Sequence, residues 1–175
     1  MATLSLAASH DTSTTALRNI LVKIQKSLNR VTANTGGLAI KAATSPTVKT
    51  VNAVNYHVDG QSGTLAAADM AALAGTVATT KFGAWLFVVD AAGTQTTVAV
   101  GLAYASAAAA RVAIQAAYAD STDALGVQSK ALIGYVIVQN ATGSDFVGGT
   151  TNLDTASITA TYVNTPGVNM MTISL

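Results

Sequence analysis

The chain has 175 residues, no cysteine and a formal net charge of +1, and only 10% of its residues are charged. This length is enough for one domain with a hydrophobic core, and the absence of cysteine excludes disulfide scaffolds and thiol chemistry. A mean hydropathy of +0.44 excludes a disordered chain, and the low charge is unusual for a soluble monomer. The composition predicts a protein that covers its surface with copies of itself or with a partner.

Residues 11–34 carry the clearest helical pattern. Serine and threonine side chains after Asp11 are suited to cap the start of a helix, and Gly36 and Gly37 follow its end. Five apolar residues between these signals recur at heptad spacing, and we call them the seam: Leu17, Leu21, Ile24, Leu28 and Val31. A seam this narrow favours a helix that pairs with copies of itself. The alternative is an ordinary amphipathic helix packed on the chain's own core.

Basic residues gather in the first third of the chain. Residues 1–58 hold most of the lysines and arginines but only one aspartate, Asp11. Four of these cations lie off the seam of the predicted helix: Arg18, Lys23, Lys26 and Arg30. They predict contact with an acidic partner surface, or simply a solvated helix face. Nucleic acid is a weaker expectation, because no aromatic residue lies among these cations and the isoelectric point is near 8.0.

Residues 36–50 read as an extended arm or linker, because they combine Gly36, Gly37 and Pro46 with small side chains. Residues 48–58 and 61–66 then predict a hairpin around the turn at 59–60. Residues 67–74 are expected to form a short helix or a loop. Residues 82–89 are apolar on both faces and predict a buried central strand, which forms a hairpin with residues 94–100.

The rest of the chain predicts one further helix and three further strands. The alanine-rich residues 106–119 favour a helix, and residues 131–138 predict a second strand that is buried on both faces. Residues 158–163 and 168–175 read as two more strands. We therefore expect an α+β fold with an N-terminal helix and an antiparallel-rich β domain that carries one short helix. The expected segments are a helical oligomerisation or anchoring segment (1–35), the arm (36–50) and a β-rich domain (51–175).

Membrane insertion and secretion are not expected. Residues 98–119 are the one apolar stretch of suitable length, but they contain Arg111 and consist largely of alanine, whereas a spanning helix needs about 20 strongly apolar residues. The first residues lack the basic region of a secretory signal.

Catalytic signals are sparse. His57, Asp59 and Ser62 lie close together in the sequence and form the only candidate for a hydrolase, but the G-x-S-x-G turn of many serine hydrolases is missing. No nucleotide-binding motif is present. We expect no enzyme activity and no cofactor.

Metal-binding signals are also weak. The two histidines are far apart and cysteine is absent, which excludes a zinc site of the usual spacing. Oxygen-rich loops could hold calcium, although aspartates at such positions more often close turns. These loops contain Asp120, Asp123, Asp145 and Asp154.

Several strings between residues 54 and 162 resemble small structural proteins of tailed-bacteriophage virions, of the decoration, cement or head-fibre type. These strings are 54–60 (VNYHVDG), 73–76 (LAGT), 82–94 (FGAWLFVVDAAGT), 132–138 (LIGYVIV), 146–154 (FVGGTTNLD) and 158–162 (ITATY). The resemblance implies a capsid-surface protein without catalytic residues, commonly a homotrimer, that binds the major capsid protein. A tail or head fibre component that contacts a host receptor is the alternative.

Overall fold

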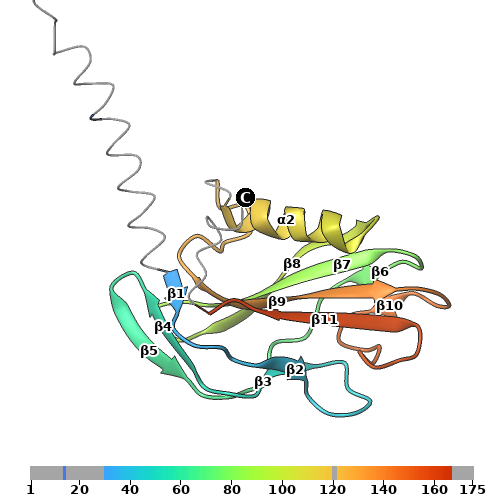
Figure 1. Cartoon of the computed structure of the whole chain (residues 1–175), viewed down its shortest axis with the longest axis horizontal. Helices are drawn as coiled ribbons and strands as arrows, with labels where there is room; N and C mark the ends of the chain where they lie inside the picture. The colour runs from blue at the N-terminus through green and yellow to red at the C-terminus, as the bar shows by residue number, and fades with distance from the viewer. Residues whose placement is uncertain (1–13, 15–29, 120–121, 167–175) are drawn as a thin grey trace, which may run out of the picture.

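The computed structural model of the chain describes residues 14, 30–119 and 122–166, and this part is mainly β-sheet, with 43% strand and 10% helix (Figure 1). The elements are β1 (Arg30–Thr32), β2 (Leu38–Ile40), β3 (Val48–Thr50), β4 (Val54–Val58), β5 (Gln61–Leu65), β6 (Thr76–Val77), β7 (Phe82–Val89), β8 (Gln95–Tyr104), α2 (Ala107–Ala119), β9 (Ala131–Asn140), β10 (Phe146–Val147) and β11 (Ile158–Asn164).

The described residues form three layers. A four-stranded antiparallel sheet in the order β11-β9-β7-β8 occupies the middle. Helix α2 covers one face of this sheet, while the sheet β1-β4-β5 and the pair β2-β3 lie on the other side (Figure 1). The two-stranded pair β10-β6 closes one end. The core is therefore divided into two clusters, one on each face of the central sheet.

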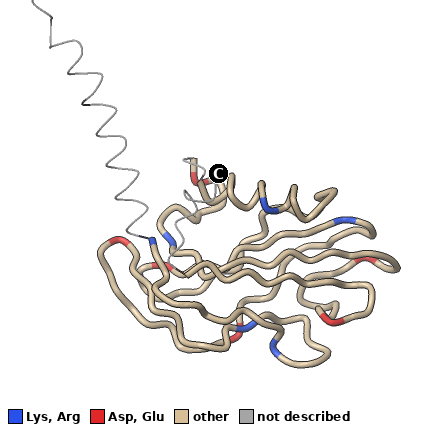
Figure 2. The backbone as a smooth tube through the Cα atoms, viewed as in Figure 1, with Lys and Arg blue, Asp and Glu red and all other residues tan. Residues whose placement is uncertain are grey.

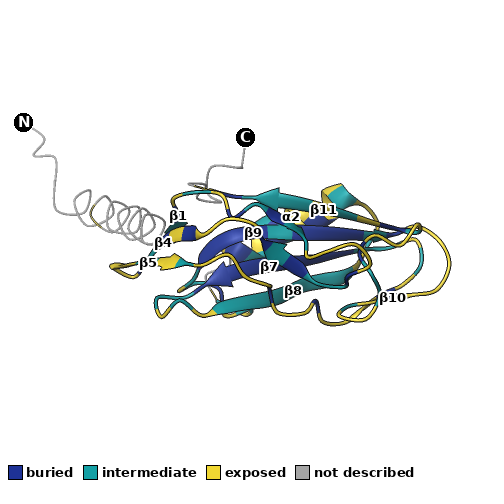
Figure 3. Ribbon diagram, turned by 90° about the horizontal axis from the view of Figure 1, so that it is seen from below, coloured by how far each residue is buried: buried dark blue, intermediate teal, exposed yellow. Residues whose placement is uncertain are grey.

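The central strands are buried because they separate two apolar layers. Alternate side chains of β7 point to opposite faces, as the pleat of a strand requires. Leu86 belongs to the cluster beneath α2, and its neighbours Trp85 and Phe87 belong to the opposite cluster. Figure 3 shows β7 and β9 almost wholly buried, with β8 partly exposed at the edge of the sheet. The predicted strands over 82–89 and 131–138 are thus confirmed, as is the hairpin formed by β7 and β8.

Helix α2 confirms the prediction over 106–119. The Ser106 hydroxyl accepts a hydrogen bond from the Ala109 amide at 3.1 Å, which caps the start of the helix. Buried residues follow at intervals of four, namely Ala110, Ile114 and Tyr118, so that one stripe of the helix packs on the central sheet.

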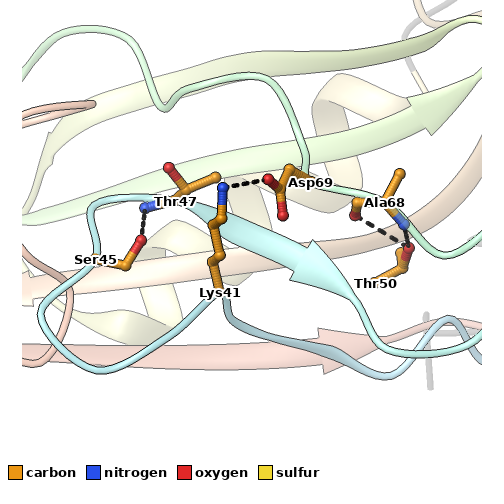
Figure 4. A network of polar contacts seen from close by, with 6 residues as sticks. All are labelled: Lys41, Ser45, Thr47, Thr50, Ala68 and Asp69. Atoms are coloured by element: carbon orange, nitrogen blue, oxygen red, sulfur yellow. Dashed lines mark hydrogen bonds and ion pairs between the residues drawn. The ribbon is translucent and has the colours of Figure 1, made fainter.

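Residues 36–50, which we expected to be an arm or linker, contain the antiparallel pair β2-β3. Leu38 and Val48 from this pair are buried in the core. An ion pair between Lys41 and Asp69 at 2.5 Å, with both side chains about half exposed, joins the pair to the segment that follows β5 (Figure 4). The Thr50 hydroxyl also accepts a hydrogen bond from the Ala68 amide at 3.0 Å. The segment 67–74 contains no helix and is held by such contacts instead.

The α+β prediction is wrong, because strands dominate the described residues and their one helix element is α2. The expected helix over 11–34 is wrong at its C-terminal end, where Arg30–Thr32 forms β1 and pairs with β4. Val31 and Thr32 are β-branched, and pairing with an existing strand outweighs the weak helical preference of such residues. The remaining seam residues, the cations before Arg30 and the strand expected over 168–175 lie outside the described residues.

Candidate functional site

Eight residues from neighbouring strands line a shallow surface cavity at the end of the molecule that holds the sheet β1-β4-β5, and two of them, Tyr56 and Gly63, are directly opposite each other in the ladder. The side chains of the other six form the surface that we call the outer face: Val31 and Ala33 from β1 and the residue after it, Asn55 and His57 from β4, and Ser62 and Thr64 from β5. The cavity has a volume of about 400 Å³. Strand alternation explains the surface, because Val54, Tyr56 and Val58 between these residues point into the core.

Cross-strand hydrogen bonds hold the polar side chains of the outer face in place. The Thr64 hydroxyl donates to the Asn55 side-chain oxygen at 2.8 Å. His57 Nδ1 and Ser62 Oγ are 2.9 Å apart, and these two residues lie directly opposite each other in the ladder. None of the six residues carries a formal charge when the imidazole is neutral. The outer face is therefore a preorganised, uncharged surface with an apolar side on β1 and a polar side on β4 and β5.

The contact between His57 and Ser62 meets the first geometric condition of the hydrolase hypothesis. Asp59, the third candidate, lies in the tight turn between β4 and β5 with a φ of 49°, and the hydrogen bonds of the described residues do not join it to the imidazole. A serine nucleophile needs a base that a third group orients and donors that stabilise an oxyanion. The pair instead has the geometry of an ordinary cross-strand contact on an exposed hairpin.

Arg30, which we expected to contact an acidic partner surface or solvent, is directed at its own domain. Its guanidinium carbon lies 4.8 Å from the centre of the Tyr118 ring, and Nη1 donates to the Val127 carbonyl oxygen at 3.3 Å. Burial raises the pKa of the Tyr118 hydroxyl, while the nearby Arg30 charge lowers it. Arg30 thus ties β1 to α2 and to the loop before β9.

Replacing Arg30 with alanine is expected to lower the free energy of unfolding by about 1 kcal/mol, because a cation–π contact and a hydrogen bond are both lost. The same change should raise the pKa of Tyr118 further, since the charge that lowers it is gone. Ultraviolet titration of tyrosinate, combined with urea unfolding, measures both effects. Arg111→Ala on the exposed side of α2 is the matched control and should change neither quantity.

The aspartates considered for calcium bind backbone amides. Asp123 Oδ1 accepts from the Val127 and Gln128 amides at 2.6 and 2.8 Å, and Asp154 Oδ2 accepts from the Thr44 amide at 2.7 Å. Over residues 30–119 and 122–166, no group of three or more potential metal ligands comes together. Asp120 lies outside these ranges. Asp123 and Asp154 therefore stabilise turns and loops by accepting hydrogen bonds from backbone amides, which is the more usual role of such residues.

Comparisons of the chain with protein-family models, with curated proteins and with solved structures find no match. In the part of the chain that the structure describes, no helix is long and apolar enough to cross a membrane.

Sequence reasoning identified His57 and Ser62 but missed Asn55 and Thr64 beside them. The signal that could have found them is the alternation on both sides of the turn at 59–60, since alternate residues of paired strands share a face. Nothing in the sequence indicated that Ala33 would complete the cavity, because the strand preceding it was expected to be helical.

Proposed function

We propose that this protein is a structural component of a tailed-phage virion, made in the host cytoplasm, that decorates or cements the capsid. In this role it binds the major capsid protein as a homotrimer and catalyses no reaction. The proposal rests on the low charge of the chain, on its resemblance to small phage virion proteins, and on the surface described next.

A partly exposed stretch of chain without charged residues carries the proposal, and the Lys130 ammonium group contacts it, 3.4 Å from the Thr96 hydroxyl. Residues 91–110, which form β8 and the start of α2, contain no charged residue, yet Ala110 alone among them is buried. Figure 2 shows that charged positions are few and scattered along the described backbone. Arg111 is the first charged residue after this stretch. Soluble monomers usually place charges on such surface, and the centres of protein interfaces are depleted in them. A surface of this kind favours contact with another protein.

The outward side of α2 is also poor in charge. Val112 is 65% exposed and is the most exposed large hydrophobic residue among those described. Ala108, Ala109 and Ala116 are also exposed, so Arg111 is the one charge along the helix. Small side chains allow close approach of a flat partner surface, as expected of a protein that lies across joints between capsid subunits.

The copy number of this chain in purified virions tests the proposal. Quantitative mass spectrometry of particles is expected to find on the order of hundreds of copies, because a capsid-surface protein follows the symmetry of the shell. On the order of ten copies would favour the tail or fibre alternative over decoration. Absence of the chain from infectious particles would overturn a structural role in the virion.

A further inference from the structure

We infer that the outer face of the sheet β1-β4-β5 is a binding site for a neutral saccharide. This inference goes beyond the proposed function and does not depend on it, because the outer face lies across the central sheet from α2 (Figure 1). A protein partner on α2 therefore leaves the outer face accessible. Three observations support the site: its hollow, its unused hydrogen-bonding groups, and the absence of charge from its lining.

The hollow of the outer face lies between the two polar cross-strand pairs described above. Because these pairs are two positions apart on their strands, they are separated by about 7 Å. Tyr56 and Gly63 lie between them but add no side chain to this side of the sheet. Tyr56 is buried in the core, and a Cβ atom on Gly63 would overlap the Tyr56 side chain. The resulting cavity of about 400 Å³ has the size of a small-molecule site and can accept a monosaccharide.

The hydrogen-bonding groups of the outer face are oriented but not fully used. The Asn55 side-chain oxygen accepts from the Thr64 hydroxyl at 2.8 Å, which fixes the amide and leaves its nitrogen to donate two hydrogen bonds. His57 uses Nδ1 in its contact with Ser62, so Nε2 is available as a donor or an acceptor. Among the described residues, neither Asn55 Nδ2 nor His57 Nε2 has a hydrogen-bond partner. A ligand hydroxyl, which both donates and accepts, matches each of these two groups.

The lining of the cavity selects an uncharged ligand. None of the eight residues that line it is lysine, arginine, aspartate or glutamate. Phosphates, sulfates and nucleic acids are recognised mainly through cationic side chains, which this face does not offer. A purely apolar ligand is also disfavoured. It would remove water from Asn55 Nδ2 and His57 Nε2 without replacing the lost hydrogen bonds.

A neutral saccharide meets both conditions. Its hydroxyl groups supply donors and acceptors around the ring, while the C–H groups of a pyranose form an apolar patch. Val31 and Ala33 offer a small apolar surface for that patch, beside the polar side chains of β4 and β5. Cross-strand hydrogen bonds already hold those polar side chains, which lowers the entropic cost of binding. Because the cavity is shallow, we expect a dissociation constant on the order of 1 mM.

Nuclear magnetic resonance titration of the full chain tests the site. The probes are glucose, galactose, mannose and N-acetylglucosamine as neutral sugars, and inorganic phosphate as an anion. We expect at least one neutral sugar to shift the side-chain amide signals of Asn55 and the ring signals of His57 in a saturable manner. Phosphate should shift neither set of signals.

Asn55→Asp should weaken binding of that sugar at least tenfold, because the carboxylate still accepts from Thr64 but the two amide donors are lost. Asn52→Asp is the matched control. It makes the same change at an exposed asparagine between β3 and β4, outside the cavity, and should leave the affinity unchanged. Thr64→Val adds no charge; it removes the hydroxyl that orients Asn55 and should also weaken binding. Circular dichroism verifies that each variant is folded.

Four outcomes would overturn the inference. If none of the neutral sugars produces saturable shifts of Asn55 and His57, the face is not a saccharide site. Tighter binding of phosphate would indicate a site for anions instead. Equal weakening by Asn52→Asp and Asn55→Asp would place the bound sugar elsewhere. Shifts of Asn55 and His57 that grow with protein concentration in the absence of sugar would mean that a second copy covers the face. The copy number in virions bears on none of these results, so this inference and the proposed function fail independently.

Discussion

Replacing Trp85 with alanine is expected to lower the free energy of unfolding by about 3–5 kcal/mol, a large share of the stability of a typical domain. Trp85 is fully buried, and its ring meets that of Phe146 edge-on, with 6.2 Å between the ring centres. Its indole nitrogen also donates to the Ala74 carbonyl oxygen at 3.0 Å. Alanine would leave a cavity and an unpaired carbonyl in the cluster between the central sheet and the layers opposite α2.

Urea unfolding followed by circular dichroism measures this loss. Trp85→Phe should lower the free energy of unfolding by less than the alanine variant does, because phenylalanine keeps much of the aromatic packing. Some loss should remain, since the hydrogen bond to the Ala74 carbonyl oxygen is removed. Val112→Ala on the exposed side of α2 should change stability by less than about 0.5 kcal/mol. A loss below about 1 kcal/mol in Trp85→Ala would show that this cluster does not stabilise the fold in the way described.

Replacing Asn140 with aspartate should destabilise the fold by about 3 kcal/mol at neutral pH. Asn140 is fully buried at the end of β9, and its amide nitrogen donates to the carbonyl oxygens of Val77 and Ser144 at 3.0 and 3.2 Å. It thereby joins β6 to the loop after β9. A carboxylate in its place would put one oxygen against two carbonyl oxygens, which repel it. Its other oxygen would take the place of the Asn140 side-chain oxygen, which is buried without a hydrogen-bond partner, so it would gain no hydrogen bond there.

The destabilisation in Asn140→Asp should depend on pH. Burial and the facing carbonyl oxygens raise the pKa of the new carboxyl in the folded state above its value of about 3.9 in the unfolded chain. The protonated side chain can still donate one hydrogen bond. Its contribution to the stability of the fold is therefore fully present below the pKa of the carboxyl in the unfolded chain, and is lost as the pH rises through the higher pKa of the folded state.

Thermal unfolding of the wild type, Asn140→Asp and Asn140→Ala at acidic and neutral pH tests this pattern. The alanine variant loses both hydrogen bonds but gains no titratable group, so its difference from the wild type should be nearly constant with pH. An equal loss for Asn140→Asp at both pH values would contradict the proposed surroundings of residue 140.

Local signals predicted most of the elements that the structure describes. The turn at Asp59 and Gly60 flanked by alternating residues predicted the pair β4-β5, and the turn after residue 89 predicted the pair β7-β8. The apolar runs predicted two strands that are buried on both faces, and the alanine-rich segment predicted α2. These signals succeed because turn chemistry and hydrophobic periodicity act over only a few residues.

The errors arose where long-range pairing outweighs local preference. Residues 30–32 continue the heptad spacing of the seam, but a strand more than twenty residues later binds them as β1. Leu38 and Val48 have glycine and proline nearby, which favours a linker, yet burial in the core makes them part of a hairpin. Spacing within a segment contains no information about a distant strand that offers hydrogen bonds and an apolar surface.

The sequence by itself determined that this protein has few charges, long uncharged segments and a β-rich body without a recognisable catalytic motif. The tertiary structure alone decided where those features lie: Arg30 against Tyr118, and Val31 beside His57 and Ser62 on one uncharged face. The physical reason is that composition limits how much polar surface a chain can present. Strand register, which depends on contacts across the whole domain, selects the side chains that share a surface.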